Sequence, residues 1–137
     1  MSRIILAIIS IVSILLLTTN SKGYQFNVKS HNLSIDTKNH KIKFSGNVII
    51  KHDNLYIMTE QMIVCYKNKQ IDKIFFLHKI QLIKGNKIIS GVNGEYSKHF
   101  NFLKIIGNVR YINGSQQILG NYFTHHFKTK VSKLSAK

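Results

Sequence analysis

The sequence predicts a single all-β domain preceded by a short N-terminal targeting segment. After residue 23, apolar and polar residues alternate with a period of two in nearly every segment, as they do in half-buried β-strands. Clusters of turn-forming residues recur roughly every 8–12 residues, the spacing of a β-sandwich or barrel. No long amphipathic helical pattern interrupts them. Together these observations predict a fold built from strands.

The first 23 residues have the pattern of a secretory signal peptide. Arg3 supplies the basic start, and the apolar run over residues 4–17 is interrupted only by two serines. That run fits the apolar region of a signal peptide, about 7–15 residues, and is short for a membrane span of about 20. We therefore expect cleavage near residue 23 and a mature domain of residues 24–137. An uncleaved N-terminal anchor is the alternative.

Bulk composition limits the chain to one modest core and indicates an anionic partner. The 137 residues are 44% hydrophobic, enough to bury a single core. Lys and Arg number 20 against 5 acidic residues, for a formal net charge of +15. Such a charge favours anionic ligands or surfaces, although heavy use of Lys, Ile and Asn along the chain contributes to it. Cys65, the single cysteine, has no partner for an internal disulfide and is expected as a small buried hydrophobe.

The stretch Phe44–Ile50 recurs in altered form at Ile105–Tyr111. Each copy contains a Gly-Asn-Val step, at residues 46–48 and 107–109, and the two steps stand 61 residues apart. Because side chains two apart share one face of a strand, each glycine falls on the apolar face. A residue without Cβ there predicts a bulge, a bend or the close approach of another backbone. The matched register suggests two related halves.

The other strands are expected on either side of these copies. Between residues 55 and 66 the apolar face changes parity at Glu60-Gln61. The block Ile71–Ile83 is the most apolar, and its β-branched and aromatic content favours strands over a helix. Residues 88–96 read as one strand whose even-numbered residues share a face. After a hairpin turn at Asn113-Gly114-Ser115, the even-numbered residues from 118 to 124 do the same, and Lys130–Ser135 forms a last short strand.

No arrangement suited to catalysis or metal binding is evident. The acidic residues lie mostly in or beside turns, and only two of the seven histidines, His125 and His126, are neighbours in sequence. Adjacent strand residues point to opposite faces, so these two do not converge on one ligand. No phosphate-binding glycine loop and no nucleic-acid motif is present, and an exported protein does not suit nucleic acid. We expect no catalytic residue, metal or cofactor.

Four stretches carry a resemblance to a known family: Phe44–Val48, Leu55–Tyr66, Gly94–Tyr96 and Ile106–Val109. With the leader and the alternating strands, they resemble the LptA/OstA family of lipopolysaccharide-transport proteins of Gram-negative envelopes. The similarity runs from about Phe26 to the C-terminus. The paired Gly-Asn-Val motifs are shared by LptA, by the membrane-anchored LptC and by the N-terminal domain of LptD. The length of this chain is most similar to LptA.

The resemblance implies a twisted, slightly open β-jelly-roll whose apolar interior holds the acyl chains of lipid A. It implies a periplasmic carrier without enzymatic activity, which joins edge to edge with other copies and with LptC-like and LptD-like proteins. Its assembly edges are expected at Tyr24–Val28 and Lys130–Ser135. Inward-facing apolar residues are expected to contact the lipid: Phe26, Phe44, Val48, Ile57, Val64, Ile83, Tyr96, Ile105 and Val109.

Two alternatives to a periplasmic bridge stay open at this point. The first is an LptC-like component anchored in the inner membrane, which differs mainly in the fate of residues 4–17. The second is a secreted basic β-domain that binds acidic polymers through its lysines. Polymer binding would weaken steeply with salt, whereas burial of acyl chains would persist.

Overall fold

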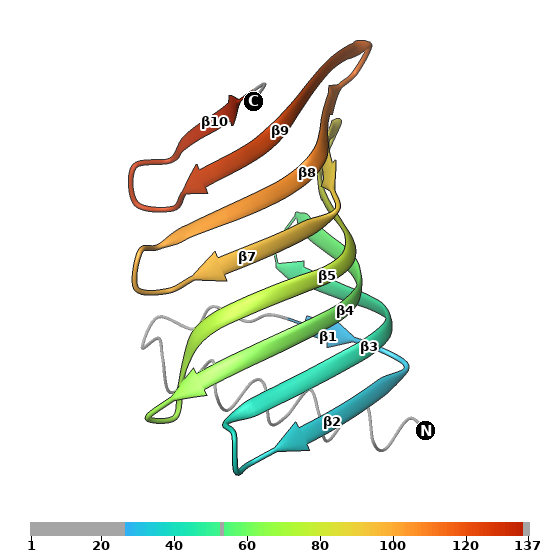
Figure 1. Cartoon of the computed structure of the whole chain (residues 1–137). Helices are drawn as coiled ribbons and strands as arrows, with labels where there is room; N and C mark the ends of the chain where they lie inside the picture. The colour runs from blue at the N-terminus through green and yellow to red at the C-terminus, as the bar shows by residue number, and fades with distance from the viewer. Residues whose placement is uncertain (1–26, 53, 136–137) are drawn as a thin grey trace.

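The computed structural model describes residues 27–52 and 54–135, and all of its regular structure is β. Every strand pairing is antiparallel, and the strands form one twisted sheet (Figure 1). The strands are β1 (Asn27–Lys29), β2 (Asn32–Asp36), β3 (Lys41–His52), β4 (Leu55–Lys67), β5 (Gln70–Lys84), β6 (Lys87–Gly91), β7 (Asn93–Ser97), β8 (Phe102–Asn113), β9 (Gln116–His126) and β10 (Val131–Ser135). The all-β prediction is confirmed. The leader lies outside the described residues, within which no helix is long and apolar enough to span a membrane.

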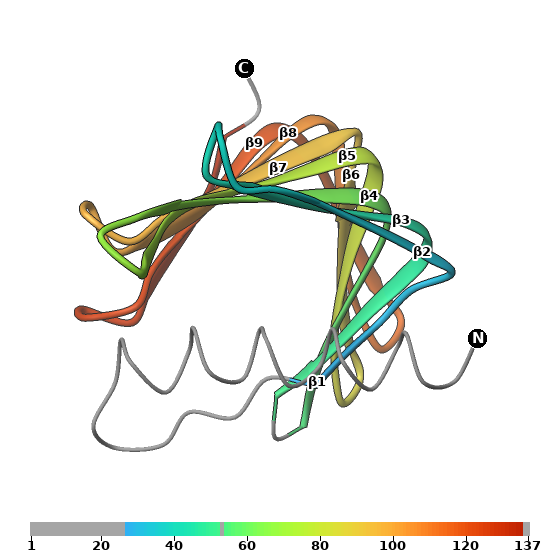
Figure 2. The same cartoon turned by 90° about the horizontal axis from the view of Figure 1, so that it is seen from below.

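The strand order in the sheet is β1-β3-β4-β5-β6-β8-β9-β10. Two short strands lie off this path: β2 pairs with β3, and β7 pairs with both β5 and β8. The short strands β1 and β2 therefore follow one another along β3, just as β6 and β7 follow one another along β8. Figure 2 shows the result, a sheet bent so that its long strands curl around an interior.

A line of bulges crosses the long strands and produces the bend. Gly46 and Asn47 of β3 stand opposite the single residue Glu60 of β4, and the register shifts there. The same residue faces a second bulge, at His78 and Lys79 of β5. All four bulge residues have positive φ, 82° and 46° in β3 and 61° and 80° in β5. A bulge bends its strand and increases the local twist, so bulges that are aligned across neighbouring strands fold the whole sheet.

The second Gly-Asn-Val step repeats this geometry. Gly107 and Asn108 of β8 have φ values of 89° and 46°, and they stand opposite one residue of β9. The backbone N–H of Val92 donates to the Gly107 carbonyl at 3.0 Å, as that of His31 donates to the Gly46 carbonyl at 2.9 Å. His31 and Val92 interrupt the paired short strands, and they too are 61 residues apart. The predicted bulges and the two related halves are both present in the backbone.

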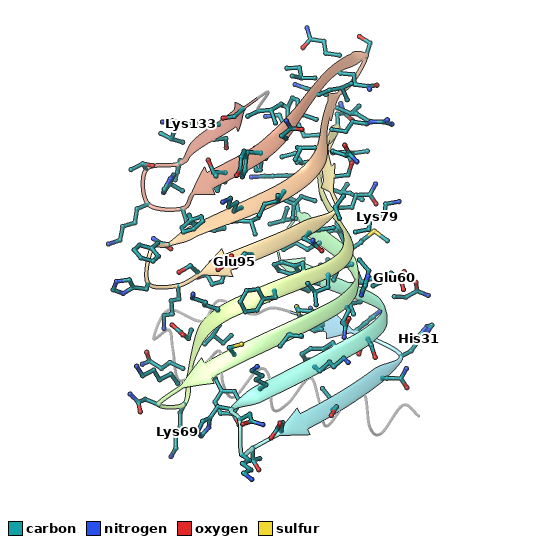
Figure 3. All side chains as sticks on the ribbon, viewed as in Figure 1. His31, Glu60, Lys69, Lys79, Glu95 and Lys133 are labelled. Carbon is teal, nitrogen blue, oxygen red and sulfur yellow. The ribbon has the colours of Figure 1, made fainter. Side chains whose placement is uncertain are left out.

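The bulge line divides the sheet into two arms, named here arm A and arm B. Arm A contains β2, β7, β10 and residues 41–45, 61–77, 102–106 and 122–126. Arm B contains β1, β6 and residues 48–52, 55–59, 80–84, 109–113 and 116–120. Figure 3 shows the labelled His31, Glu60 and Lys79 following one another along the bend between the arms.

One apolar core lies on the inner face of the bent sheet and draws on both arms. Its buried hydrophobic members are Val28, Ile42, Phe44, Val48, Ile50, Met62, Val64, Ile71, Phe76, Ile80, Leu82, Leu103, Ile105, Val109 and Phe123. Thr59 is a buried polar residue at the bend, and its hydroxyl lies 2.7 Å from the Lys79 carbonyl oxygen. That bond ties the bulge of β5 to the centre of β4, so the bend is held by a side chain as well as by the strand pairings.

The structure corrects several strand faces expected from the sequence. The parity change within β4 is confirmed, and residues 71–83 lie within the single strand β5. Residues 88–96 form two strands rather than one, because the strand is interrupted at Val92. In the first of these strands Ile89 faces the core, and not Ile88. In β9 the inward-facing residues are Gly120 and then Phe123, rather than Gly120 and Tyr122, because the bulge in β8 shifts the pairing register between them. Cys65 is only partly buried and lies on the outer face.

Candidate functional site

Two unbroken apolar rows cross the inner face from one edge of the sheet to the other. In antiparallel strands, residues directly opposite each other place their side chains on the same face, so the register defines each row. The row in arm A is Leu33, Phe44, Met62, Phe76, Gly94, Ile105, Phe123 and Leu134. The row in arm B is Val28, Ile50, Ile57, Leu82, Ile89, Tyr111 and Ile118. Each row draws one residue from every strand that it crosses.

Most of the residues predicted to line the interior lie on this inner face. Five of them are buried: Phe44, Val48, Val64, Ile105 and Val109. Two more, Ile57 and Tyr96, are partly buried and pack against the core. They belong to arm B and arm A respectively, so a ligand on the inner face would meet one of them in each arm. Phe26, the remaining N-terminal candidate, lies outside the described residues.

Ile83 is placed differently from its prediction. Its register partners are Tyr56 and Ile88, and Tyr56 is exposed on the outer face of the sheet. The inner position belongs to the preceding residue, Leu82, which is 8% exposed and pairs with Ile57. The assignment of Ile83 to the interior is therefore wrong. Both residues are apolar, so alternation in the sequence does not distinguish them.

The predicted set also left out buried residues of the inner rows, among them Met62, Phe76, Leu82 and Phe123. Met62 pairs with Phe44 on one side and Phe76 on the other, and Phe123 pairs with Ile105. The signal that would have found them is cross-strand register. Once each Gly-Asn step is assigned as a bulge opposite one residue, counting outward along the hairpins places Met62 and Phe123 on the inner face.

Tyr96, His125 and Ser132 are polar residues of the inner face in arm A. Burial raises the pKa of the Tyr96 hydroxyl, whose ring packs edge-to-face on Phe127 with centroids 5.8 Å apart. His125 Nδ1 lies 2.7 Å from Ser132 Oγ. Burial lowers the pKa of His125, and the charges of His126 and Lys84 lower it further. Burial therefore favours the uncharged forms of Tyr96 and His125.

Charged side chains gather on the outside of the sheet and in the turns. The Nζ atom of Lys104 lies 4.7 Å from the centroid of the Tyr122 ring. The Nζ atom of Lys51 lies 5.7 Å from the centroid of the Tyr56 ring. Lys73 and Glu95 form an ion pair at 3.9 Å. Among the described residues, no three His, Cys, Asp or Glu side chains come together in a way that could hold a metal ion. The site is thus an apolar inner face with cations around it.

Comparison with known proteins assigns this architecture to a family. A family model described as LptA/(LptD N-terminal domain) LPS transport protein matches residues 27–131. The chain belongs to this family. The LptA-family assignment agrees with the resemblance carried by the Gly-Asn-Val steps, both of which lie within the matched range. No curated protein matches the sequence.

The fold of the LptA family is also found by comparison with solved structures. The chain is similar to LptH of Pseudomonas aeruginosa, described as the LptA homologous periplasmic component of the lipopolysaccharide transport device. The match has a TM-score of 0.66 and 11% sequence identity, and it covers 80% of each chain. At that identity the likeness establishes a shared fold.

Proposed function

We propose that this LptA-family protein is a periplasmic carrier that holds the acyl chains of lipopolysaccharide against its inner face. The observation that carries the proposal is the pair of apolar rows, which run from edge to edge with no charged residue in them. Transfer of acyl chains from water onto such a surface contributes about 25 cal/mol per Å² buried. No reaction is required, so we propose that the protein is not an enzyme and uses no cofactor.

The charge distribution supports an amphipathic anionic ligand. Acyl chains would lie along the rows while the phosphorylated head group remains at the open margin, near lysines in the turns between strands. Lys69, Lys98 and Lys128 lie in the turns at the ends of the arm A strands. We infer that residues 24–137 form the exported domain and that the preceding 23 residues are removed on export.

A photo-crosslinking experiment tests the carrier. A probe replacing Ile57 or Tyr96, the partly exposed inner-face residues of the two arms, should capture lipopolysaccharide. The same probe at Lys43 or Asn47, both exposed, should not. A probe at Phe44 or Ile105, each fully buried, shows whether the lipid displaces the packed core. Equal capture at Lys43 and Ile57 would contradict the assignment.

We further propose that the two ends of the sheet join with other copies and with LptC-like and LptD-like proteins. Among the described strands, β2 pairs only with β3, and β10 only with β9. β7, the counterpart of β2 in the second half, is paired on both sides because β5 occupies its other edge. The free edge of β2 thus stands where a further antiparallel strand would extend the sheet, and pairing there would continue the apolar row of arm A.

Removal of residues 129–137 tests the joint. The shortened protein should keep its β circular dichroism and still bind lipopolysaccharide, but lose self-association in light scattering and its partners in pull-downs. Unchanged association would show that β10 is not the joint. N-terminal sequencing of the exported protein tests its localisation, because a start at Met1 in the membrane fraction would favour the LptC-like alternative.

A further inference from the structure

Arm B is apolar on its outer face as well as on its inner face. An antiparallel sheet with one face on the core usually turns a polar face to water. Here the outer positions include a connected apolar band across five strands: Ile49, Tyr56, Met58, Ile83, Ile88 and Ile112. The register places Ile49 beside Met58, and Tyr56, Ile83, Ile88 and Ile112 in one line. Tyr56 and Met58 are 39% and 38% exposed.

Basic residues border this band, and no described carboxylate lies in arm B. The cations on this outer face are Lys29, Lys51 and Arg110. Lys51 pairs with Tyr56 and reaches over its ring, while Arg110 flanks the band in β8. The four acidic residues that the structure describes are Asp36, Asp72 and Glu95 in arm A and Glu60 on the bulge line. Asp53, between β3 and β4, lies outside the described residues.

The outer face of arm A provides the contrast. It also exposes an apolar pair, Ile106 and Tyr122, at 37% and 41%, and a lysine, Lys104, over a tyrosine ring. However, Glu95 lies directly beside Lys104 in the register and forms an ion pair with Lys73. The outer face of arm A therefore mixes carboxylates with its lysines, whereas the described charges on the outer face of arm B are all positive.

We propose that the outer face of arm B docks on an anionic phospholipid surface. Tyr56 and Met58 enter the interfacial region of the bilayer, and Lys51 and Arg110 contact lipid phosphates. An amphipathic surface of this kind, apolar with a basic border, is what a monotopic membrane contact requires. A bilayer that contains anionic lipids has a negatively charged surface, which complements a face whose described charges are all positive. This docking uses the face opposite to the lipid-carrying rows, and does not depend on them.

Vesicles without lipopolysaccharide test the docking separately from lipid carriage. The exported protein is sedimented with vesicles of phosphatidylcholine plus phosphatidylglycerol, and with phosphatidylcholine alone. Binding should require phosphatidylglycerol. Lys51→Gln should weaken it about fivefold, the effect of one basic residue at an anionic surface. Lys104→Gln removes the same charge from a lysine that also lies over a tyrosine, and should change binding less than twofold.

The apolar contribution is tested with a second matched pair. Tyr56→Ser with Met58→Ser should weaken binding about tenfold through lost interfacial burial. Ile106→Ser with Tyr122→Ser alters residues of the same exposure in arm A and should leave binding nearly unchanged. Circular dichroism of each variant confirms that the sheet persists. Equal loss from both arms, or equal binding to vesicles without phosphatidylglycerol, would overturn the proposal.

A local probe gives a readout that does not depend on total binding or on the N-terminus. In a Cys65→Ser background, an environment-sensitive fluorophore is attached after Met58→Cys, or after Lys43→Cys on the outer face of arm A. The probe at position 58 should shift to the blue when phosphatidylglycerol vesicles are added, whereas the probe at position 43 should not. If the emission of the probe at position 58 shifts to the blue as the protein concentration rises in the absence of vesicles, a second copy of the protein covers this face. That result would refute membrane docking.

Discussion

Replacement of Gly46 by Ala should destabilise the protein through two separable effects. Its φ of +82° lies in the left-handed region, where an L-residue with a side chain loses about 1–2 kcal/mol. A Cβ at this position would also lie 2.9 Å from the Cβ of His31, an approach that real Cβ atoms essentially never show. Forcing an extra carbon into such a place costs about 1–3 kcal/mol. The expected total is about 2–5 kcal/mol.

Gly114 provides the matched control. It also has positive φ, at +61°, but a Cβ there would meet nothing within 4 Å. Gly114→Ala should therefore show the backbone cost alone, about 1–2 kcal/mol. The loss of chain entropy in the unfolded state is the same for both substitutions and cancels in the comparison. The difference between the two variants isolates the close approach of His31 at the bulge.

Urea denaturation followed by far-ultraviolet circular dichroism measures both changes in the free energy of unfolding. The midpoint for Gly46→Ala should lie clearly below that for Gly114→Ala, with unchanged slopes. Gly107→Ala should behave like Gly46→Ala, because its Cβ would lie 3.0 Å from the Cβ of Val92. Equal costs for Gly46→Ala and Gly114→Ala would refute the view that the close approach of His31 is what requires glycine at this position of the Gly-Asn-Val step.

Three further predictions test the bend, the register and the titration of the inner face. Thr59→Val should cost about 1–3 kcal/mol in urea denaturation, because it removes the hydroxyl that donates to the Lys79 carbonyl at 2.7 Å; Thr59→Ser, which keeps that donor, should cost less. Phe76→Ala should cost about 3–5 kcal/mol, whereas Phe75→Ala, one residue away on the outer face, should cost clearly less; comparable losses would place the register of β5 in error. Because the pKa of His125 is lowered in the folded state, the unfolded chain binds more protons below about pH 6.5, so this residue reduces stability as the pH falls from 7 towards 5. His125→Asn should flatten that part of the stability curve at constant ionic strength, and an unchanged slope would rule out this histidine as its source.

The all-β class and the positions of two irregularities in the strands follow from the sequence alone. Alternation with a period of two is a local property, so it is readable without knowing which strands pair. A glycine on the apolar face of a β-branched strand has few explanations, and at Gly46 and Gly107 the predicted bulge is present. The position of the parity change was readable because the polar pair Glu60-Gln61 interrupts an otherwise apolar strand.

Only the tertiary structure decided which face several strands present beyond the bulge line. Leu82 and Ile83 are both apolar, and only the pairing decides between them, because Leu82 stands between the core-facing residues Ile57 and Ile89 of the neighbouring strands. Likewise, Phe123 rather than Tyr122 faces the core because the extra residue lies in β8, on the neighbouring strand. A one-residue shift in pairing reverses every side chain that follows it. Periodicity therefore determines that a segment is a strand, whereas its inner face is determined by a partner far away in the sequence.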